Sequence, residues 1–397
     1  MKSIKLSIIL LLGGVIMFIG CSKDETSTNN AQVNFDAAYV VNGESNTISI
    51  INITTNKVEN TIDLTKLQSS SGDGLMGMGM DNMWPHHIYL SPDKSKLVVA
   101  APGVDFSEGH AMMQASDATG GTTDAHSQHH GGSTTSGAAN TVMPGRILVI
   151  DALTGNLLKE IALEEMAHNA IFSPDGKELW TAQMMPEGKI KVFDAVSYTL
   201  LSTISVGQMP AEVTFSDDGK KAYVANGMSN TVTVVDAVSK KVLETIEVGA
   251  NPVGAWPGMD GMMYVDNEDG QSISMIDGMT NMMTDTLDLG FMPGMAARNT
   301  MMNQMWVSDP NGSMIHMWER NNAAIHMIGK SYDDYIHKGE VAVGNGAHAI
   351  AFSKDGKTGY VTNQNEGTVS VVDIANLKET MKITVGKKPN GIVMRFM

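Results

Sequence analysis

The strongest constraint in this sequence is a unit of about 40 residues that recurs along the chain. The run AHNAIFSPDGKELWTAQMMPEGKIKVFDAVSYTLLSTISVG is followed at once by QMPAEVTFSDDGKKAYVANGMSNTVTVVDAVSKKVLETIEVG. A third copy near the end reads GAHAIAFSKDGKTGYVTNQNEGTVSVVDIANLKETMKITVG. An aspartate marks the same place in successive copies, with spacings of 43, 42 and 41 residues: Asp151, Asp194, Asp236 and Asp277. Any fold for this chain must therefore be built from repeated units.

Each unit contains four short runs of alternating apolar and polar residues, for example VTF, KAYVAN, TVTVVD and KVLETIEV. Turn sequences such as DDG and NG separate these runs, which is typical of strands joined by hairpins. Four strands per unit and a period near 40 residues indicate the blades of a β-propeller. One blade cannot bury both of its faces, so the blades must pack into a ring.

The two ends of the chain complement each other. The N-terminal run AAYVVNGESNTISIINITTNKVENTIDL supplies only the second, third and fourth strands of a blade, and the closing KKPNGIVMRFM reads as the missing first strand. Joining them makes seven blades and removes open sheet edges. The sequence therefore predicts an all-β, seven-bladed β-propeller over residues 35–397, in which the C-terminal strand completes the N-terminal blade.

The motifs YVVN, YVAN and YVTN resemble those of the YVTN-repeat propeller family, and the likeness covers nearly the whole chain after residue 34. The resemblance implies a central channel lined by the innermost strand of each blade. It also implies one face, here called the top, that carries two sets of loops. These loops join one blade to the next, or join the second and third strands of a blade.

The first 20 residues are expected to be a signal peptide, because Lys2 and Lys5 precede an apolar run too short for a typical membrane span. The sequence FIGC resembles a bacterial lipobox, which implies that Cys21, the only cysteine of the chain, is lipidated. Residues 21–34 then form a polar tether. We expect an outer-membrane lipoprotein of the cell envelope, facing either the periplasm or the exterior.

The formal net charge of −16 argues against binding to nucleic acid or to an anionic membrane surface. Such a charge attracts cations, although solubility alone also explains it.

Three histidines occupy one slot of the repeat, four residues before the apolar residue of LSPD, FSPD or FSKD: His86, His168 and His348. The other blades carry Ala211, Val253, Gly294 and Asn390 at this slot, and His87 lies one residue further along. Imidazoles that converge on one axis could bind copper, zinc or a haem iron. The ring is similar to the propellers of nitrous oxide reductase and cytochrome d1. Alternatively, these histidines satisfy loop carbonyls.

Methionine is unusually frequent, with 32 in the chain and 15 between Met259 and Met327. Core packing is the ordinary explanation. Met262 and Met282, however, replace two lysines of the preceding blade. Met301 and Met302 replace Asp218 and Gly219 of a hairpin turn. All four methionines are therefore expected to face water.

The segment LMGMGMDNMWPHH places four methionines directly before His86 and His87: Met76, Met78, Met80 and Met83. It resembles the Met-x-Met runs of extracytoplasmic copper carriers. Thioethers favour Cu(I), and imidazole binds either oxidation state of copper. Further methionines are expected in loops of the top face: Met184, Met185, Met209, Met228 and Met292.

An insertion at residues 103–144 is rich in Gly, Ser, Thr and Ala, so we expect a mobile loop above the top face. It carries further candidate metal ligands: His110, Met112, Met113, His126, His129 and His130. Low-complexity drift is the alternative explanation for this tract.

These patterns predict an envelope protein that binds metal for buffering or for delivery to a partner protein, and they favour copper among the candidate metals. Two alternatives stay open: a surface scaffold or adhesion module for protein or polysaccharide, and a carrier of haem or quinone. No catalytic motif is present, so the expectation leans away from an enzyme. The recurrent aspartates are expected to cap turns. The sequence assigns no role to His316, His326 or His337.

Overall fold

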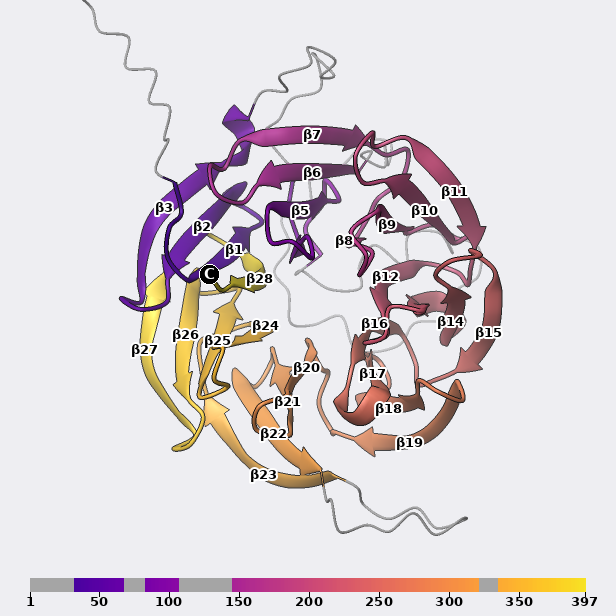
Figure 1. Ribbon diagram of the computed structural model, residues 1–397. Helices are drawn as coiled ribbons and strands as arrows, with labels where there is room; N and C mark the ends of the chain where they lie inside the picture. The colour runs from indigo at the N-terminus through magenta and orange to yellow at the C-terminus, as the bar shows by residue number, and fades with distance from the viewer. Residues whose placement is uncertain (1–31, 68–82, 107–144, 321–334) are drawn as a thin grey trace, which may run out of the picture. The chain divides into compact units, whose positions relative to one another are not determined.

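The computed structural model describes residues 32–67, 83–106, 145–320 and 335–397. These residues form seven four-stranded antiparallel sheets, which Figure 1 shows as blades around a central axis. The predicted all-β, seven-bladed propeller is therefore confirmed. The described residues include no α-helix, but they form three short 3₁₀ helices: η1 (Leu64–Lys66), η4 (Gly227–Ser229) and η5 (Met259–Gly261).

Blade one combines β1 (Ala37–Asn42), β2 (Thr47–Asn52) and β3 (Lys57–Asp63) with β28 (Pro389–Arg395). Blade two contains β4 (Ile88–Leu90), β5 (Lys96–Ala101), β6 (Arg146–Asp151) and β7 (Leu157–Ala162). Blade three contains β8 (Ala170–Phe172), β9 (Glu178–Gln183), β10 (Lys189–Asp194) and β11 (Leu200–Ser205). Blade four contains β12 (Pro210–Phe215), β13 (Lys221–Asn226), β14 (Thr231–Asp236) and β15 (Val242–Glu247).

Blade five contains β16 (Pro252–Pro257), β17 (Met262–Asn267), β18 (Ser272–Asp277) and β19 (Met282–Asp288). Blade six contains β20 (Ala296–Asn299), β21 (Gln304–Asp309), β22 (Met314–Arg320) and β23 (Tyr335–Ala342). Blade seven contains β24 (Ala347–Phe352), β25 (Thr358–Asn363), β26 (Thr368–Asp373) and β27 (Lys378–Thr384).

The ring closes by antiparallel pairing of β28 with β1, as the two chain ends predict. Ala37 pairs with Arg395 and Val40 with Ile392, so the C-terminal strand becomes the innermost strand of blade one. Contacts with the propeller begin slightly before the predicted start at residue 35. Val33 is buried, and its N–H donates a hydrogen bond to the Leu153 carbonyl at 2.9 Å.

The predicted signal peptide and Cys21 lie outside the described residues, as do most of the tether and residues 107–144 of the insertion. In the part of the chain that the structure describes, no helix is long and apolar enough to cross a membrane.

The asparagine that ends the YVTN-type motif connects strands within a blade. In blade four the Asn226 amide donates to the hydroxyls of Thr231 at 3.1 Å and Thr233 at 2.9 Å. The same contacts recur in blades one, five and seven through Asn42, Asn267 and Asn363. These amides are buried, so their hydrogen bonds avoid the cost of unsatisfied polar groups.

The glycine that closes one blade packs on this asparagine in the next blade. A Cβ atom at Gly249 would lie 2.6 Å from Cγ of Asn267, and one at Gly386 would lie 2.7 Å from Cγ of Asn42. Gly207 makes the same approach to Asn226. The motif therefore sets the spacing between blades, because only a residue without a Cβ atom fits there.

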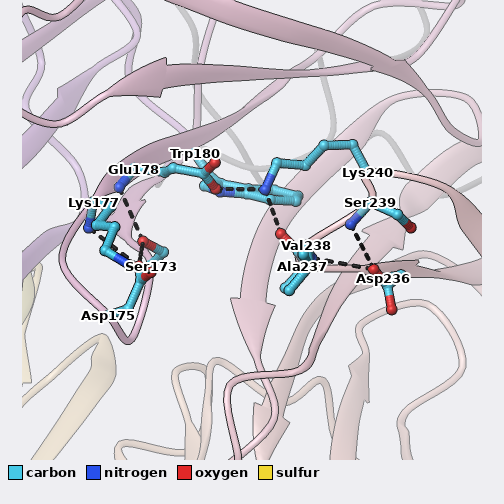
Figure 2. Close-up of polar contacts among 10 residues, drawn as sticks. All are labelled: Ser173, Asp175, Lys177, Glu178, Trp180, Asp236, Ala237, Val238, Ser239 and Lys240. Carbon is cyan, nitrogen blue, oxygen red and sulfur yellow. Dashed lines mark hydrogen bonds and ion pairs between the residues drawn. The ribbon is translucent and has the colours of Figure 1, made fainter.

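The recurrent aspartates cap the turns between third and fourth strands, as predicted. Figure 2 shows Asp236, whose Oδ1 accepts hydrogen bonds from the backbone N–H groups of Val238 and Ser239. Asp151, Asp194 and Asp277 accept equivalent bonds in their own blades. These carboxylates stabilise turns and are not available as a catalytic set.

The same view shows how blades three and four are joined. Lys240 of blade four pairs with the Glu178 carboxylate of blade three at 2.6 Å, and the Trp180 indole N–H donates to the same oxygen at 2.9 Å. The Lys240 ammonium also lies 4.9 Å from the centre of the Trp180 ring. Both charged groups are mostly buried, so this pair is better shielded from water than a surface salt bridge.

The methionines divide between core and surface. Met282 and Met301 are 65% and 64% exposed, as their alignment predicts. Met262 is only partly exposed and packs against the core between blades five and six. Met302 is also partly buried. The prediction that these two side chains face water fully is therefore wrong. Five others fill hydrophobic cores: Met259, Met263, Met275, Met305 and Met317. Core packing therefore explains part of the methionine excess.

Replacing Gly249 by alanine should destabilise the ring, because the new methyl group would overlap the Asn267 side chain. We expect a loss of about 1 to 3 kcal/mol in the free energy of unfolding, the usual range for overpacking. Gly359→Ala is the matched control, since its methyl group would meet its nearest neighbour at an ordinary 3.7 Å. Chemical denaturation of both variants checks this, and equal stability of the two would contradict the interblade packing.

Candidate metal centre

A cavity of about 240 Å³ lies where the first strands of the blades meet. Six of the seven positions in the predicted histidine slot line it: His86, His168, Ala211, Val253, Gly294 and His348. The seventh, Asn390, is buried and accepts a hydrogen bond from Gln364, which also lines the cavity, at 2.6 Å. The repeat alignment therefore places these positions correctly around one opening.

The four histidines form one cluster. The ring centroid of His86 lies 4.3 Å from that of His168, 4.8 Å from that of His87 and 5.7 Å from that of His348. One nitrogen each of His86, His87 and His168 can be chosen so that all three lie within 4.8 Å of one another. Bonds from zinc to imidazole nitrogen are about 2.0 Å, so the three nitrogens would have to move closer together to bind a single ion.

Glu212 connects two of these imidazoles. Its Oε1 lies 2.8 Å from Nε2 of His87 and 3.1 Å from Nδ1 of His168, while Oε2 accepts a hydrogen bond from the Tyr89 hydroxyl at 3.3 Å. The carboxylate is 1% exposed. The position of Glu212 in β12 matches that of His87 in blade two, so the repeat itself brings them to the same height.

Glu212 approaches one nitrogen of each ring. An ionised carboxylate only accepts hydrogen bonds, so it would favour a proton on the facing nitrogens, Nε2 of His87 and Nδ1 of His168, although neither makes a hydrogen bond of good geometry in this structure. In that arrangement the other two nitrogens, Nδ1 of His87 and Nε2 of His168, would be the ones able to bind a metal. Carboxylates that hold metal-binding imidazoles in this way are usual outside the ligand set of metal sites.

The charge states agree with this assignment. Burial alone would raise the pKa of Glu212, but the neighbouring His87 and His168 outweigh it and lower the pKa to about 2. Burial lowers the pKa of His86 well below 6.5, and repulsion from the other three imidazoles lowers it further. Burial raises the pKa of Tyr89 well above 10, and Glu212 adds to this rise, so the phenol stays protonated and can donate.

His348 extends the cluster from blade seven, which is separated from blade two only by blade one. Burial lowers its pKa to about 3, with His87 and His168 contributing to the decrease. Its Nδ1 is buried and has no hydrogen-bond partner among the described residues. A buried nitrogen without a partner is costly in a stable fold and is the kind of atom that a bound cation would satisfy.

Thioethers line the same cavity. Met184, Met209 and Met292 are among the lining residues, and the sequence had placed all three in loops of the top face. Met166 also lines the cavity, together with Phe106, whose ring lies 5.4 Å from His86 and 5.3 Å from His168. The cavity thus offers nitrogen and sulfur donors together.

Met83 does not lie where the sequence predicts a displayed ligand. It is 2% exposed and packs in the core between blades one and two. Its backbone N–H and that of Trp84 donate to Oδ1 of Asn46, which folds this segment against blade one. The remaining predicted ligands lie outside the described residues: Met76, Met78, Met80, His110, Met112, Met113, His126, His129 and His130.

Sequence reasoning missed Met166, Phe106 and the role of Glu212. Met166 stands two residues before His168, in a connection between blades that the family pattern implies is at the top. Its position in this connection could have identified Met166 as a candidate ligand. Phe106 lies in the irregular segment after β5 and has no counterpart in the other repeats, so alignment could not place it.

Comparisons with known proteins support the fold. No protein-family model matches this chain, and no curated protein sequence matches it. A functionally unknown protein from Desulfotomaculum acetoxidans is similar in structure, with a TM-score of 0.65 and 13% identity over 91% of this chain and 99% of that one. Hydrazine synthase of Kuenenia stuttgartiensis gives a TM-score of 0.52 at 17% identity, over 77% of this chain and 88% of that one.

Dihydro-heme d1 dehydrogenase NirN, solved in complex with DHE, gives a TM-score of 0.54 at 12% identity. The match covers 94% of this chain and 76% of that one. At these identities the likeness establishes a shared propeller fold, with cytochrome d1-like propellers among its neighbours.

The buried imidazoles make stability depend on pH. The pKa values of His86, His168 and His348 are lower in the folded protein than the usual 6.5, so below that pH the unfolded chain binds more protons. The free energy of unfolding should therefore fall as the pH drops from about 6.5 towards 3. His348→Asn should reduce this slope by up to about 1.4 kcal/mol per pH unit.

Denaturant unfolding of the metal-free protein between pH 7 and pH 4 measures this difference. Asparagine is a suitable replacement because Asn390 already occupies the same slot in blade one. Identical slopes for the parent and the variant would show that His348 is not held neutral by burial.

Proposed function

We propose that this chain is a copper-binding β-propeller that holds the metal in the cavity at its axis, for buffering or for delivery to a partner in the cell envelope. The observation that carries the proposal is one cavity at the axis that is lined by four imidazoles and four thioethers. Glu212 orients two of these imidazoles. His86, His87 and His168 would form the main ligand set, with His348 facing them.

The donor chemistry favours copper over harder cations. Thioethers are soft ligands that select Cu(I), and imidazole binds copper in either oxidation state. Met166, Met184, Met209 and Met292 would supply soft donors around the imidazoles. Zinc remains compatible with the histidines alone, so the thioethers distinguish the two metals.

The cavity is small for a large organic ligand. At about 240 Å³ it is smaller than the range of about 300 to 1,000 Å³ found for pockets that enclose drug-sized ligands. The structurally similar NirN is described in complex with DHE. In this protein the ring centroid of His86 lies 4.8 Å from that of His87 and 4.3 Å from that of His168, which leaves no room for a macrocycle between these rings.

The cellular setting of the proposal rests on sequence motifs. The motifs YVVN, YVAN and YVTN lie in β1, β13 and β25, which supports membership of the YVTN-repeat family. The FIGC sequence supports lipidation at Cys21 and an outer-membrane location. The formal net charge of −16 favours accumulation of cations near the protein.

Removal of one imidazole should weaken copper binding strongly. We expect His168→Ala to lower Cu(I) affinity by about 100-fold or more, since outer-shell partners of a metal site alone contribute about 10- to 100-fold. Glu212→Gln should cost about 10- to 100-fold, because it removes the acceptor that orients His87 and His168. Titration of the purified full chain against a competing Cu(I) chelator measures both.

Val253→Ala is the matched control, because Val253 occupies the histidine slot of blade five and lines the cavity without offering a donor atom. Its affinity should equal that of the parent protein. If His168→Ala and Val253→Ala bind Cu(I) equally well, the cavity is not the copper site. A stable protein partner captured equally with and without chelator would favour the scaffold alternative.

A further inference from the structure

Blade six carries a second group of metal-ligating side chains, on its outer strands and apart from the axial cavity. His316 lies on β22, and His337 and Glu340 lie on β23. One ligand atom from each of the three can be chosen so that all lie within 4.8 Å of one another. None of the three lines the axial cavity.

A β-bulge brings these residues to one face of the sheet. His316 pairs with Glu340 and Trp318 pairs with His337, with a register shift between Met317 and Trp318. His337 and Glu340 are three residues apart and would project to opposite faces of a regular strand. The extra residue in β23 restores them to the same face, which is a known use of bulges near functional sites.

Gly339 allows the backbone to make this bulge. Its φ of 151° is unfavourable for residues with a side chain, and a Cβ atom there would lie 2.6 Å from Cδ1 of Leu377. The local sequence HKGE therefore specifies a backbone that groups the imidazole and the carboxylate.

Surrounding groups fix the orientation of His316. The Phe291 ring stacks on its imidazole with centroids 4.4 Å apart and an angle of 22° between the planes. Its Nδ1 lies 3.6 Å from the Glu340 carboxylate, and its Nε2 lies 3.9 Å from the Asp309 carboxylate. One nitrogen thus faces the candidate ligand Glu340, while the other faces the Asp309 carboxylate, which could accept a hydrogen bond from its N–H when a metal binds.

The other two side chains are free to adjust. His337 and Glu340 are exposed, whereas the His316 side chain is only 14% exposed. The centroid of His337 lies 5.8 Å from that of His316 and 5.1 Å from that of Trp318. One fixed ligand and two adjustable ones can converge on an ion at small conformational cost.

We propose that His316, His337 and Glu340 form a surface site for a borderline divalent cation, with Zn²⁺ as the best-matched ion. Two imidazoles and one carboxylate are the ligands of many zinc sites that keep an open fourth position. This set consists of two imidazoles and a carboxylate, whereas the axial cavity is lined by imidazoles and thioethers. The site stands whether or not the axial cavity binds copper.

Calorimetric titration of the full-length protein with Zn²⁺ tests this site. To exclude zinc bound at the axis, the titration is repeated in a His86→Ala, His168→Ala background. We expect one equivalent of Zn²⁺ to persist there. His337→Ala and Glu340→Gln should each weaken that equivalent by about 100-fold or more, beyond the loss typical of outer-shell partners.

Ile336→Ala is the matched control, since Ile336 is exposed on the same strand but pairs with Glu319 on the opposite face. It should bind Zn²⁺ like the parent. His337 and Glu340 are exposed, so their replacement should leave the thermal unfolding midpoint unchanged. The proposal is overturned if both variants match the Ile336→Ala control in stoichiometry and affinity. If the double background does not fold, the same comparison in the parent protein decides.

Discussion

Pairing of β28 with β1 is the contact on which the rest of this structure depends. Without it, blade one would lack its innermost strand and the ring would end in two open sheet edges. Closure forces the first strands of all blades to converge on one axis. The cavity lining comes from residues as distant in sequence as His86 and His348, which only a closed ring brings within 5.7 Å between ring centroids. The interblade contacts of asparagine and glycine then set the spacing at which those strands meet.

At the centre of the ring, a buried carboxylate and several buried imidazoles stabilise each other. Glu212 would be costly to bury alone, but His87 and His168 contact it and Tyr89 donates to it. In return the carboxylate lies 2.8 Å from Nε2 of His87 and 3.1 Å from Nδ1 of His168, on one side of each ring. The outer site on blade six has a different origin, because it depends on a bulge between two strands of a single blade. The fold thus offers a soft, enclosed donor set at its axis and a harder, exposed set at its rim.

The repeat made the fold predictable because each of its signals has one local cause. Aspartates at fixed spacing cap turns, the closing glycines pack on asparagines, and the incomplete blades at the two ends complement each other. Alignment within the repeat also placed His86, His168 and His348 around one opening. Met83 was misplaced because it stands in an irregular connection, where strand alternation gives no information about burial. The grouping of His337 with Glu340 could not be predicted from strand alternation either, because a bulge moves every residue beyond it to the other face of the sheet.

The central claim is that the axial imidazoles bind copper, and locating the metal tests it most directly. An anomalous difference map, recorded at the copper absorption edge from crystals of the copper-loaded protein, would show the ion itself. The account predicts a peak within bonding distance of nitrogen atoms of His86, His87 and His168. Copper peaks found only elsewhere on the protein, with these imidazoles unliganded, would contradict it.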